Sequence, residues 1–457
     1  MSIYNTLLAQ YKNYSDEPPV PPEPVVDKYT PFFVKNLSGE ENTLTITKGS
    51  SSAPALEIYK SNDGTSWTLF GTTAYPGITL TMQPNEIVYL RCNNGQMASG
   101  WNDYNTINCS KDYEVAGNIM SLLYGENFTG EETTFNSKNY CFDCLFYGST
   151  TLKKADRLIM PSTDTGAGGY YRMFSGCSGL ETPPIMTTGI KSGYGGMQEM
   201  FYNCSSLIAT PQFTANIKNH TNRNFSKLFY NCSSITLANC SLTVDQYEDP
   251  DDTGILESVF QGCSKLEKAP QITIISYNQY AIKKRICAKA FYGCTSLNDI
   301  SDISMETGMY GYDCYQMFYN CSSLTEPLDM NYTKSGTYTF YQMYKGCTSL
   351  TSFNKTISVG SSYDCYEMFY RCTSLVTGPT LTCATLGSNA FNYMFYGCSS
   401  LSSLTCLATN ISASGCTTNW LKNVSATGTF TKDPNMSSWP TGANGIPEGW
   451  TVVDYQG

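Results

Sequence analysis

Histidine is nearly absent from this chain, since His220 is the only one among 457 residues. Most proton-transfer machinery uses the near-neutral pKa of histidine, so a Ser-His-Asp triad would have to be built around this one residue. Its surroundings, IKNHTNRN, are polar and typical of a surface loop, which favours a solvated side chain. The composition therefore argues against histidine-dependent catalysis.

Long apolar runs and long runs of like charge are also absent. No stretch approaches the roughly 18 consecutive apolar residues of a membrane-spanning helix, so we expect no membrane insertion. The start, MSIYNTLLAQYKNYSDE, lacks the features of a signal peptide, and we expect no export by the general secretion route. The 28 basic and 38 acidic residues give a formal charge of −10 without clustering, which argues against a nucleic-acid partner.

The first 28 residues predict an anchoring arm. Residues 1–17 could form a short helix, which needs a partner to be stable. Four of its side chains would lie near one face and are candidate anchors: Ile3, Leu7, Leu8 and Tyr11. Residues 18–28 contain PPVPPEPVV, which favours extended polyproline II structure and predicts a semi-rigid linker.

In residues 29–115, apolar side chains recur at every second position, as at Leu44 and Ile46. Turn sequences such as the NDG that begins at Asn62 separate the alternating segments. This pattern predicts a small antiparallel β-sandwich domain. It carries no recognisable chemistry, so we interpret it as a spacer or docking module.

Residues 116–424 repeat with a period of 25 to 31 residues, in a unit that reads Met-Phe-Tyr-Asn/Gly-Cys-Ser/Thr-Ser-Leu. Nine copies cover Phe174–Leu180, Phe201–Leu207, Phe229–Ile235, Phe260–Leu266, Phe291–Leu297, Phe318–Leu324, Tyr344–Leu350, Phe369–Leu375 and Phe395–Leu401. A degenerate first copy, Leu145–Leu152, has Ser149 in place of the cysteine. Such self-similarity predicts a solenoid of about ten repeats, and residues 425–457 would form its C-terminal cap.

One face of each unit is apolar. An apolar residue stands four positions before each phenylalanine, another stands directly before it, and the cysteine follows three positions after it, which is the i, i+3, i+4, i+7 pattern of a helix. Asn or Gly before the cysteine would end this helix, and the leucine after it would lead into a short strand such as LEKAPQITI. The sequence thus predicts a mixed α/β repeat solenoid with one short strand and one short helix per repeat.

These units resemble the BspA-like leucine-rich repeat family, whose repeats carry AFxxCxxL-type motifs, over roughly residues 140–424. The flanks GNIMSLLYGENF and NWLKNVSATGTFTKDPNMSSWPTGANGIPEGWTVV also look like the ends of such proteins. Departures are Ser149 for cysteine, Tyr344 for phenylalanine and Val424 where a last cysteine would fall. The resemblance implies recognition and adhesion, in bacterial surface proteins and bacteriophage proteins, without a catalytic apparatus.

The cysteines follow the repeat. Nine of the twenty occupy one position: Cys177, Cys204, Cys232, Cys263, Cys294, Cys321, Cys347, Cys372 and Cys398. They could form a disulfide or metal ladder, but one thiol per repeat lacks the paired spacing of a zinc site, so we interpret them as buried packing residues. Cys141 and Cys144 form one CxxC pair without a second pair or a histidine nearby. We therefore expect no metal or other cofactor.

Carboxylates offer no obvious active site. Glu199 and Glu367 share a repeat position but lie six repeats apart, which is about 30 Å, against the separation below about 10 Å that glycosidases need. The loop YEDPDDTG, with Asp249, Asp251 and Asp252, lacks calcium-loop spacing and is expected to be a solvated insertion. The next repeat has a basic insertion with Lys283, Lys284 and Arg285, and we hypothesise that the two insertions pair into one protrusion.

Tyrosine supplies the best functional candidates, with 35 residues. Two columns, one residue after and three residues before the phenylalanine, would share one helix flank with half-buried rings. Their members are Tyr147, Tyr202, Tyr230, Tyr292, Tyr319, Tyr370 and Tyr396 in the first column and Tyr171, Tyr315, Tyr341 and Tyr366 in the second. The flank is either a structural stacking ladder or a recognition surface, since tyrosine gives a large contact area at low entropic cost. All of them except Tyr147 and Tyr171 are our candidate recognition residues.

We expect a non-enzymatic structural and binding protein. The favoured hypothesis is a bacteriophage virion appendage, such as a head or tail fibre or decoration protein, which is assembled in the host cytoplasm and displayed on the virion surface. Its arm would bind other virion structural proteins, and its solenoid would contact a host surface glycan or protein. The alternatives are a bacterial cell-surface adhesin and, as a minor one, a polysaccharide-degrading enzyme. A homo-oligomer is compatible with each.

Overall fold

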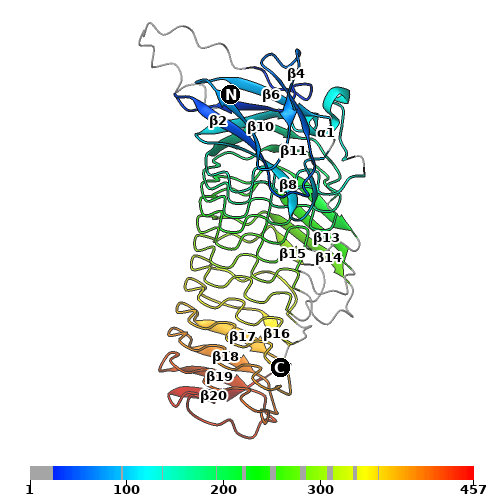
Figure 1. Cartoon of the computed structure of the whole chain (residues 1–457). Helices are drawn as coiled ribbons and strands as arrows, with labels where there is room; N and C mark the ends of the chain where they lie inside the picture. Colours follow the sequence, from blue (N-terminus) through cyan, green and yellow to red (C-terminus); the bar gives the residue numbers. More distant parts are fainter. Residues whose placement is uncertain are drawn as a thin grey trace.

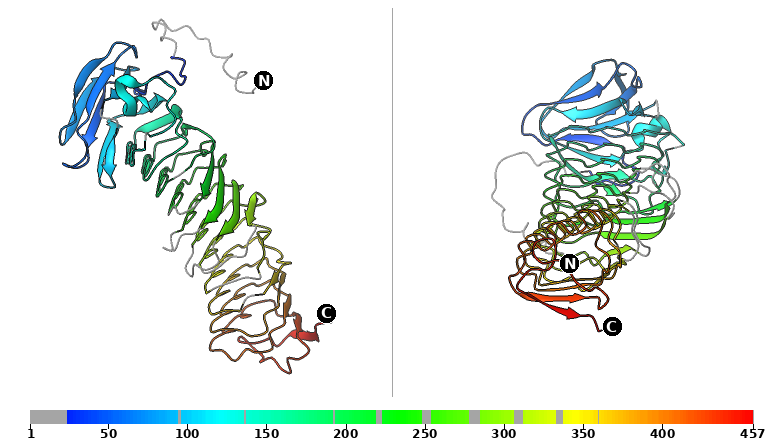
Figure 2. Two further views of the ribbon diagram at one scale, coloured as in Figure 1. Left: turned by 90° about the vertical axis from the view of Figure 1, so that its right-hand side faces the viewer. Right: turned by 90° about the horizontal axis from the view of Figure 1, so that it is seen from below.

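A computed structural model of the chain describes residues 24–93, 96–135, 137–191, 193–218, 223–247, 254–277, 285–305, 312–332, 337–358 and 360–456. The molecule is elongated, with a β domain at the N-terminal end and a cap at the C-terminal end (Figures 1 and 2). Between them the chain winds through stacked repeats, each of which we call a rung. No helix in the described part of the chain is long and apolar enough to cross a membrane. The predicted anchor residues Ile3, Leu7, Leu8 and Tyr11 lie outside the described residues.

The β domain contains nine strands. They are β1 (Phe33–Asn36), β2 (Asn42–Lys48), β3 (Glu57–Ser61), β4 (Thr68–Thr72), β5 (Gly77–Met82), β6 (Ile87–Cys92), β7 (Ala98–Gly100), β8 (Asp103–Cys109) and β9 (Tyr113–Asn118). One sheet has the order β9-β1-β6-β3-β4 and the other has the order β5-β2-β8-β7. Apolar side chains of both sheets, such as Val34 and Ile46, join one fully buried core.

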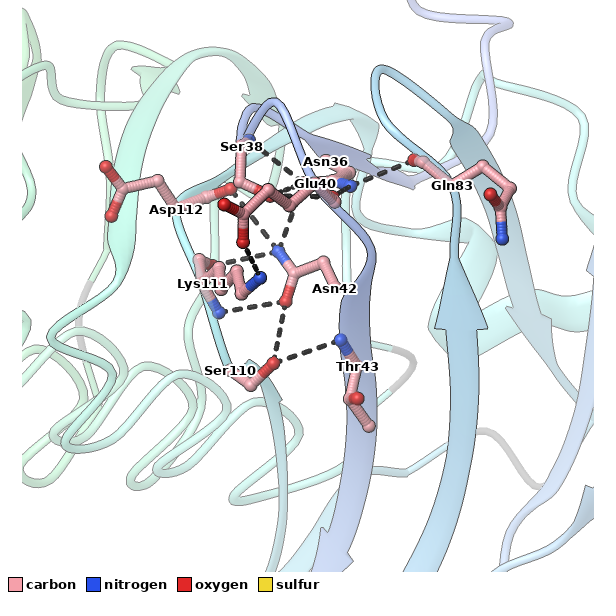
Figure 3. A network of polar contacts seen from close by, with 9 residues as sticks. All are labelled: Asn36, Ser38, Glu40, Asn42, Thr43, Gln83, Ser110, Lys111 and Asp112. Carbon is pink, nitrogen blue, oxygen red and sulfur yellow. Dashed lines mark hydrogen bonds and ion pairs between the residues drawn. The ribbon is translucent and has the colours of Figure 1, made fainter.

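Two buried asparagines hold one end of this domain together (Figure 3). The Asn36 side chain donates to the carbonyls of Glu40 and Gln83, at 2.8 and 2.9 Å. The Asn42 amide oxygen accepts hydrogen bonds from the Lys111 backbone and the Ser110 hydroxyl, at 2.8 and 3.1 Å. Because these side chains are satisfied within the domain, the network connects three loops and leaves no group directed at a ligand.

The β domain passes directly into the solenoid. Strand β9 pairs antiparallel with β1 on one side and parallel with β10 (Leu152–Met160) on the other. The short helices α1 (Ser121–Tyr124) and η2 (Gly125–Asn127) lie between these two strands in the sequence. The domain also caps the first rung, because the amides of Met97 and Ile107 donate to the carbonyls of Cys141 and Leu145, at 3.0 and 2.7 Å. Terminal repeats need such a cap because they lack one neighbour.

Parallel strands form one side of the solenoid. After β10 they are β11 (Ile185–Met186), β12 (Thr214–Lys218), β13 (Ser241–Tyr247), β14 (Gln271–Tyr277), β15 (Ile303–Met305), β16 (Thr356–Ile357), β17 (Thr377–Leu381), β18 (Ser403–Cys406), β19 (Gly428–Lys432) and β20 (Trp450–Asp454). Neighbouring rungs pair in register, as in the four-stranded sheet β12-β13-β14-β15 and the five-stranded sheet β16-β17-β18-β19-β20. The predicted repeat solenoid is therefore confirmed (Figure 1).

The prediction of one helix per repeat is wrong, and the fold is a β-solenoid. Where the helix was expected, alternate amides make two different hydrogen bonds. In the rung of Phe201, the amides of Tyr202 and Cys204 donate three residues back along the chain, which closes tight turns. The amides of Phe201 and Asn203 donate to carbonyls of the next rung, at 2.9 and 2.8 Å. An α-helix would use these amides internally and could not make this ladder.

Backbone dihedral angles explain why the predicted helix does not form. In the same rung φ is positive at Gly195, Glu199 and Asn203, with values of 60°, 55° and 59°. A right-handed helix needs φ near −63°, so a positive φ at every fourth residue prevents one. The motif is too short to separate a period of four from the helical period of 3.6, because both place apolar residues at i, i+3, i+4 and i+7. Asn or Gly before the cysteine supplies one of these left-handed positions and ends no helix.

A row of stacked rings runs through the core. Phe146, Phe174, Phe201, Phe229, Phe260, Phe291, Phe318, Tyr344, Phe369 and Phe395 stack on one another with centroids 5.2–5.7 Å apart. The hydroxyl of Tyr344 makes hydrogen bonds with the hydroxyl of Tyr332 and the amide of Leu328, which satisfies this buried polar group. At the C-terminal end, Trp420 stacks on Trp439 and closes the core.

Arg371 provides a test of the turn structure. It occupies the Gly/Asn position of its rung at φ 61° and is exposed. Because glycine adopts this conformation without strain, we expect Arg371→Gly to be more stable than Arg371→Ala by about 0.5–1 kcal/mol in urea denaturation. Alanine is the matched control, since it also loses the contact with the Tyr370 ring. In a helix the order would be reversed by about 1 kcal/mol.

Candidate recognition surface

Two tyrosine columns lie beside the row of core rings. We name them by their position relative to the core aromatic residue of each rung. The plus-one column contains Tyr147, Tyr202, Tyr230, Tyr292, Tyr319, Tyr370 and Tyr396, and the minus-three column contains Tyr171, Tyr315, Tyr341 and Tyr366. All nine candidate recognition residues are half-buried. Equivalent positions of successive rungs lie above one another in a solenoid, so the columns become ladders in space.

Within a ladder the rings lie face to face. Tyr202 and Tyr230 stack at 4.8 Å with 9° between their planes, and Tyr292 and Tyr319 stack at 4.5 Å with 8°. Tyr341 stacks on its two neighbours in the minus-three column, at 5.0 and 4.9 Å. Tyr370 and Tyr396 form a further pair at 5.0 Å.

A third column was missed from the sequence. Tyr312, Tyr338 and Tyr363 stand six residues before the core aromatic and stack on one another at 5.0 Å. Their rings also contact those of the minus-three column, since Tyr312 and Tyr315 lie 5.9 Å apart. The spacing of 26 and 25 residues was a readable signal, because it matches the repeat. With Tyr315, Tyr341 and Tyr366, this minus-six column forms an array of two by three rings.

The stacking determines which parts of the tyrosine rings are exposed to solvent. The face of each ring inside a ladder is covered by the next rung, so the solvent meets ring edges and hydroxyls. Burial raises the pKa of the Tyr202, Tyr292 and Tyr366 hydroxyls above the ordinary value of 10. These hydroxyls are therefore protonated at neutral pH and can both donate and accept hydrogen bonds.

A lysine fills one interruption of the plus-one column. Lys345 stands where a tyrosine would be, and its Nζ lies 5.6 Å from the ring centroid of Tyr319 and 4.5 Å from that of Tyr370. The same Nζ forms an ion pair with Glu367 at 2.5 Å. A cation between two ring faces is attracted to both of them. The ladder is thus continued by a charged side chain and is not broken.

The β domain covers the N-terminal end of the flank. The ring of Trp101 lies edge-on to Tyr171 at 4.2 Å and contacts Tyr140 at 5.3 Å. Tyr171 is consequently only 7% exposed and is not accessible to a large partner, whereas Tyr147 is 44% exposed. The domain therefore covers the first tyrosine of the minus-three column but not the first tyrosine of the plus-one column.

The two glutamates considered for catalysis lie in different ion-pair clusters. Glu199 pairs with Arg172 at 2.7 Å and with Lys227 at 3.5 Å, which are residues of the rungs on either side. Glu367 pairs with Lys345 and accepts a hydrogen bond of 2.6 Å from the Gln342 side chain. Each carboxylate thus stabilises contacts between rungs. His220, Asp249, Asp251, Asp252, Lys283 and Lys284 lie outside the described residues. Of the charged residues named in the two insertions that we hypothesised to pair, only Arg285 is described.

The cysteine column is a hydrogen-bonded ladder of free thiols. Each thiol donates to the carbonyl of the core aromatic residue in the preceding rung, at 2.9–3.1 Å. In the first repeat Ser149 replaces the cysteine, and its hydroxyl donates to the side chain of Asn108 in the β domain at 2.7 Å. Burial raises the pKa of Cys141 to about 12, so this thiol of the CxxC pair stays protonated. No group of three or more metal-ligating side chains occurs among the described residues.

Asp143 is a buried carboxyl group in the first repeat. It occupies the minus-three position, is 0% exposed, and lies near the Cys144 thiol and the Arg172 guanidinium. Burial raises its pKa from the ordinary 3.8 to about 8, and these two neighbours offset the rise only in part. The folded protein therefore retains a proton that the unfolded chain releases above about pH 4, and it loses stability as the pH rises toward 8.

We expect Asp143→Asn to remove this pH dependence. The variant should be more stable than the native protein by about 2–4 kcal/mol at pH 8 and by less at pH 5, because the amide cannot ionise. Urea denaturation at the two pH values measures the difference. Asp156→Asn, at an exposed position of β10, is the matched control. An equal pH dependence in the native protein and Asp143→Asn would show that Asp143 is already charged when folded.

Comparison with known proteins gives one match. The family described as "Mycoplasma protein of unknown function, DUF285" matches residues 286–407, roughly a quarter of the chain. No curated protein and no solved structure matches the chain. The matched residues contain the array of two by three rings that Tyr312, Tyr315, Tyr338, Tyr341, Tyr363 and Tyr366 form. The family match and the β-solenoid are compatible with a BspA-like repeat protein and suggest a surface or binding role.

Proposed function

We propose that the protein is a non-enzymatic binding protein in which a rigid β-solenoid presents the tyrosine ladders to a surface glycan or protein. One observation carries the proposal: half-buried tyrosines of successive rungs stack face to face into rows along the solenoid. Such rows are ordered before binding, so little side-chain entropy is lost when a partner is contacted.

The biological setting that we propose is a bacteriophage virion appendage. The N-terminal arm binds other virion structural proteins, and the solenoid projects from the virion toward the host surface. An elongated shape with the β domain at one end and the cap at the other supports this arrangement, because one end can be anchored while the flank stays accessible (Figure 2).

A bacterial cell-surface adhesin is the second candidate. It is favoured by the family match, whose description names Mycoplasma, a cellular organism. The binding surface would be the same in both settings, and the anchoring of the chain would differ. The location of the N-terminus is therefore the property that separates them.

The role of the tyrosine hydroxyls can be tested without disturbing the stack. We expect the double substitution Tyr341→Phe and Tyr366→Phe to weaken binding to bacterial cells about tenfold, because outward hydrogen bonds are lost while the rings remain. The melting temperature should stay within experimental error. Tyr75→Phe, at a 69% exposed tyrosine of the β domain, is the matched control. Unchanged cell binding by the double variant would contradict recognition by these hydroxyls.

The location of the arm can be tested by electron microscopy. We expect a gold label on an N-terminal tag to lie against the body of purified phage particles, because the arm anchors the chain. A label on a C-terminal tag is the control and should lie farther out. N-terminal labels on bacterial envelopes, with none on particles, would favour the adhesin.

A further inference from the structure

Two positions in the minus-three column are small, Ser226 and Ala288, and Ala288 directly precedes the tyrosines. Going along the solenoid, this column contains Glu257, Ala288, Tyr315, Tyr341 and Tyr366. Tyr315 stacks on Tyr341 at 5.0 Å, but its opposite face meets the rung of Ala288, where the side chain is a single methyl group. The ladder of rings therefore ends at Tyr315, and the Lys289 ammonium lies over this ring, 5.9 Å from its centroid.

A pocket of about 350 Å³ lies at this end of the ladder and is lined by residues of four successive rungs, from Glu257 to Tyr341. Its lining includes Ala288, the rings of Tyr312 and Tyr315, and the charged side chains of Arg285 and Lys289. Glu257 of the preceding rung lies on the far side. The volume is at the lower end of the range of about 300–1,000 Å³ that is usual for small-molecule sites.

The charged residues that line the pocket favour an anionic ligand. The Arg285 guanidinium lies 5.6 Å from the Tyr312 centroid, and the Lys289 ammonium lies 5.9 Å from the Tyr315 centroid. Arg285 is held by Glu257, with 3.5 Å between the nitrogen and the oxygen, and remains exposed. Two cations and one carboxylate leave a net charge of +1 at the pocket. The carboxylate of Glu257 can also accept hydrogen bonds from hydroxyl groups.

We propose that this pocket binds one carboxylate-bearing saccharide ring, that is, a uronate residue of an acidic glycan. The sugar ring packs against Tyr312 and Tyr315, which line the pocket, its carboxylate pairs with Arg285 and Lys289, and its hydroxyls donate to Glu257. The inference rests on the proposed binding function and assigns a ligand class to one part of the surface. An aromatic side chain of a protein partner is disfavoured, because it offers no anionic group to the two cations.

The test uses methyl glucuronoside and methyl glucoside as probes of the full-length protein, with ligand-observed NMR titration. We expect the glucuronoside to bind about tenfold more tightly than the neutral sugar, because its carboxylate makes charge-assisted hydrogen bonds. Arg285→Gln should remove most of this preference while weak binding of both sugars remains.

A larger side chain at Ala288 tests whether the sugar binds in this pocket. Ala288→Tyr supplies the ring that the column lacks, so we expect a folded protein that binds neither sugar. Asn392→Tyr is the matched control, since position 392 occupies the same column three rungs beyond Tyr315 and should leave glucuronoside binding unchanged. An unchanged melting temperature of Ala288→Tyr separates blocking of the pocket from misfolding. If Ala288→Tyr unfolds, Arg285→Gln alone decides the proposal through the ratio of the two affinities.

Three results would overturn the proposal: no binding of glucuronoside, equal binding of both sugars by the native protein, or glucuronoside binding that survives in folded Ala288→Tyr. Binding of N-acetyltyrosinamide in place of the sugars would assign the pocket to a protein partner. These outcomes are separable from the proposed function. If the pocket inference fails, the effect of Tyr341→Phe and Tyr366→Phe on cell binding persists, and if the proposed function fails, glucuronoside binding by the purified protein persists.

Discussion

In the turns around the core aromatic residue of each rung, every second amide donates to a carbonyl of the next rung, and the rest of the structure depends on this hydrogen-bond ladder. The amide of Phe201, for example, reaches the carbonyl of Leu228, while its neighbours close local turns. The ladder fixes the spacing between rungs, so equivalent side chains must lie about 5 Å apart. This distance is close to that of stacked rings, and it allows phenylalanine to repeat in the core and tyrosine to repeat on the flank.

The same ladder leaves backbone groups without partners at both ends of the solenoid. Carbonyls of the first rung lack donors, and amides of the last rung lack acceptors. The β domain supplies the missing donors from Met97 and Ile107. At the other end the side chain of Asn444 accepts from the Asn419 amide at 2.8 Å, and Trp420 donates to the carbonyl of Gly445 at 2.9 Å. The two end structures therefore satisfy the backbone as well as covering the core, which gives a physical reason for their departure from the repeat.

The sequence predicted the repeat and its columns, but not the local conformation. Repetition of the Phe-Tyr-Gly/Asn-Cys unit indicates a solenoid without any knowledge of the backbone. The helix was inferred from apolar spacing alone, and eight residues cannot separate a period of four from one of 3.6. Asn203 or Gly176 before the cysteine was a usable signal, since both tolerate positive φ, yet it was read as a helix end. Tyr312, Tyr338 and Tyr363 were missed because they stand outside the motif that defined the columns.

In a structure built from equivalent positions, the residues that break a column carry the most information about binding. A tyrosine whose two neighbours are tyrosines has both ring faces covered, so only its edge and hydroxyl are available to a partner. Where Lys345 interrupts the plus-one column, the cation occupies the space between two rings, so the ladder stays filled. Where Ala288 interrupts the minus-three column, the Lys289 ammonium lies over the Tyr315 ring, and a pocket lined by tyrosines and charged side chains lies beside this end of the ladder. Repetition thus accounts for the scaffold, and the end of a tyrosine ladder is where it leaves room for a ligand.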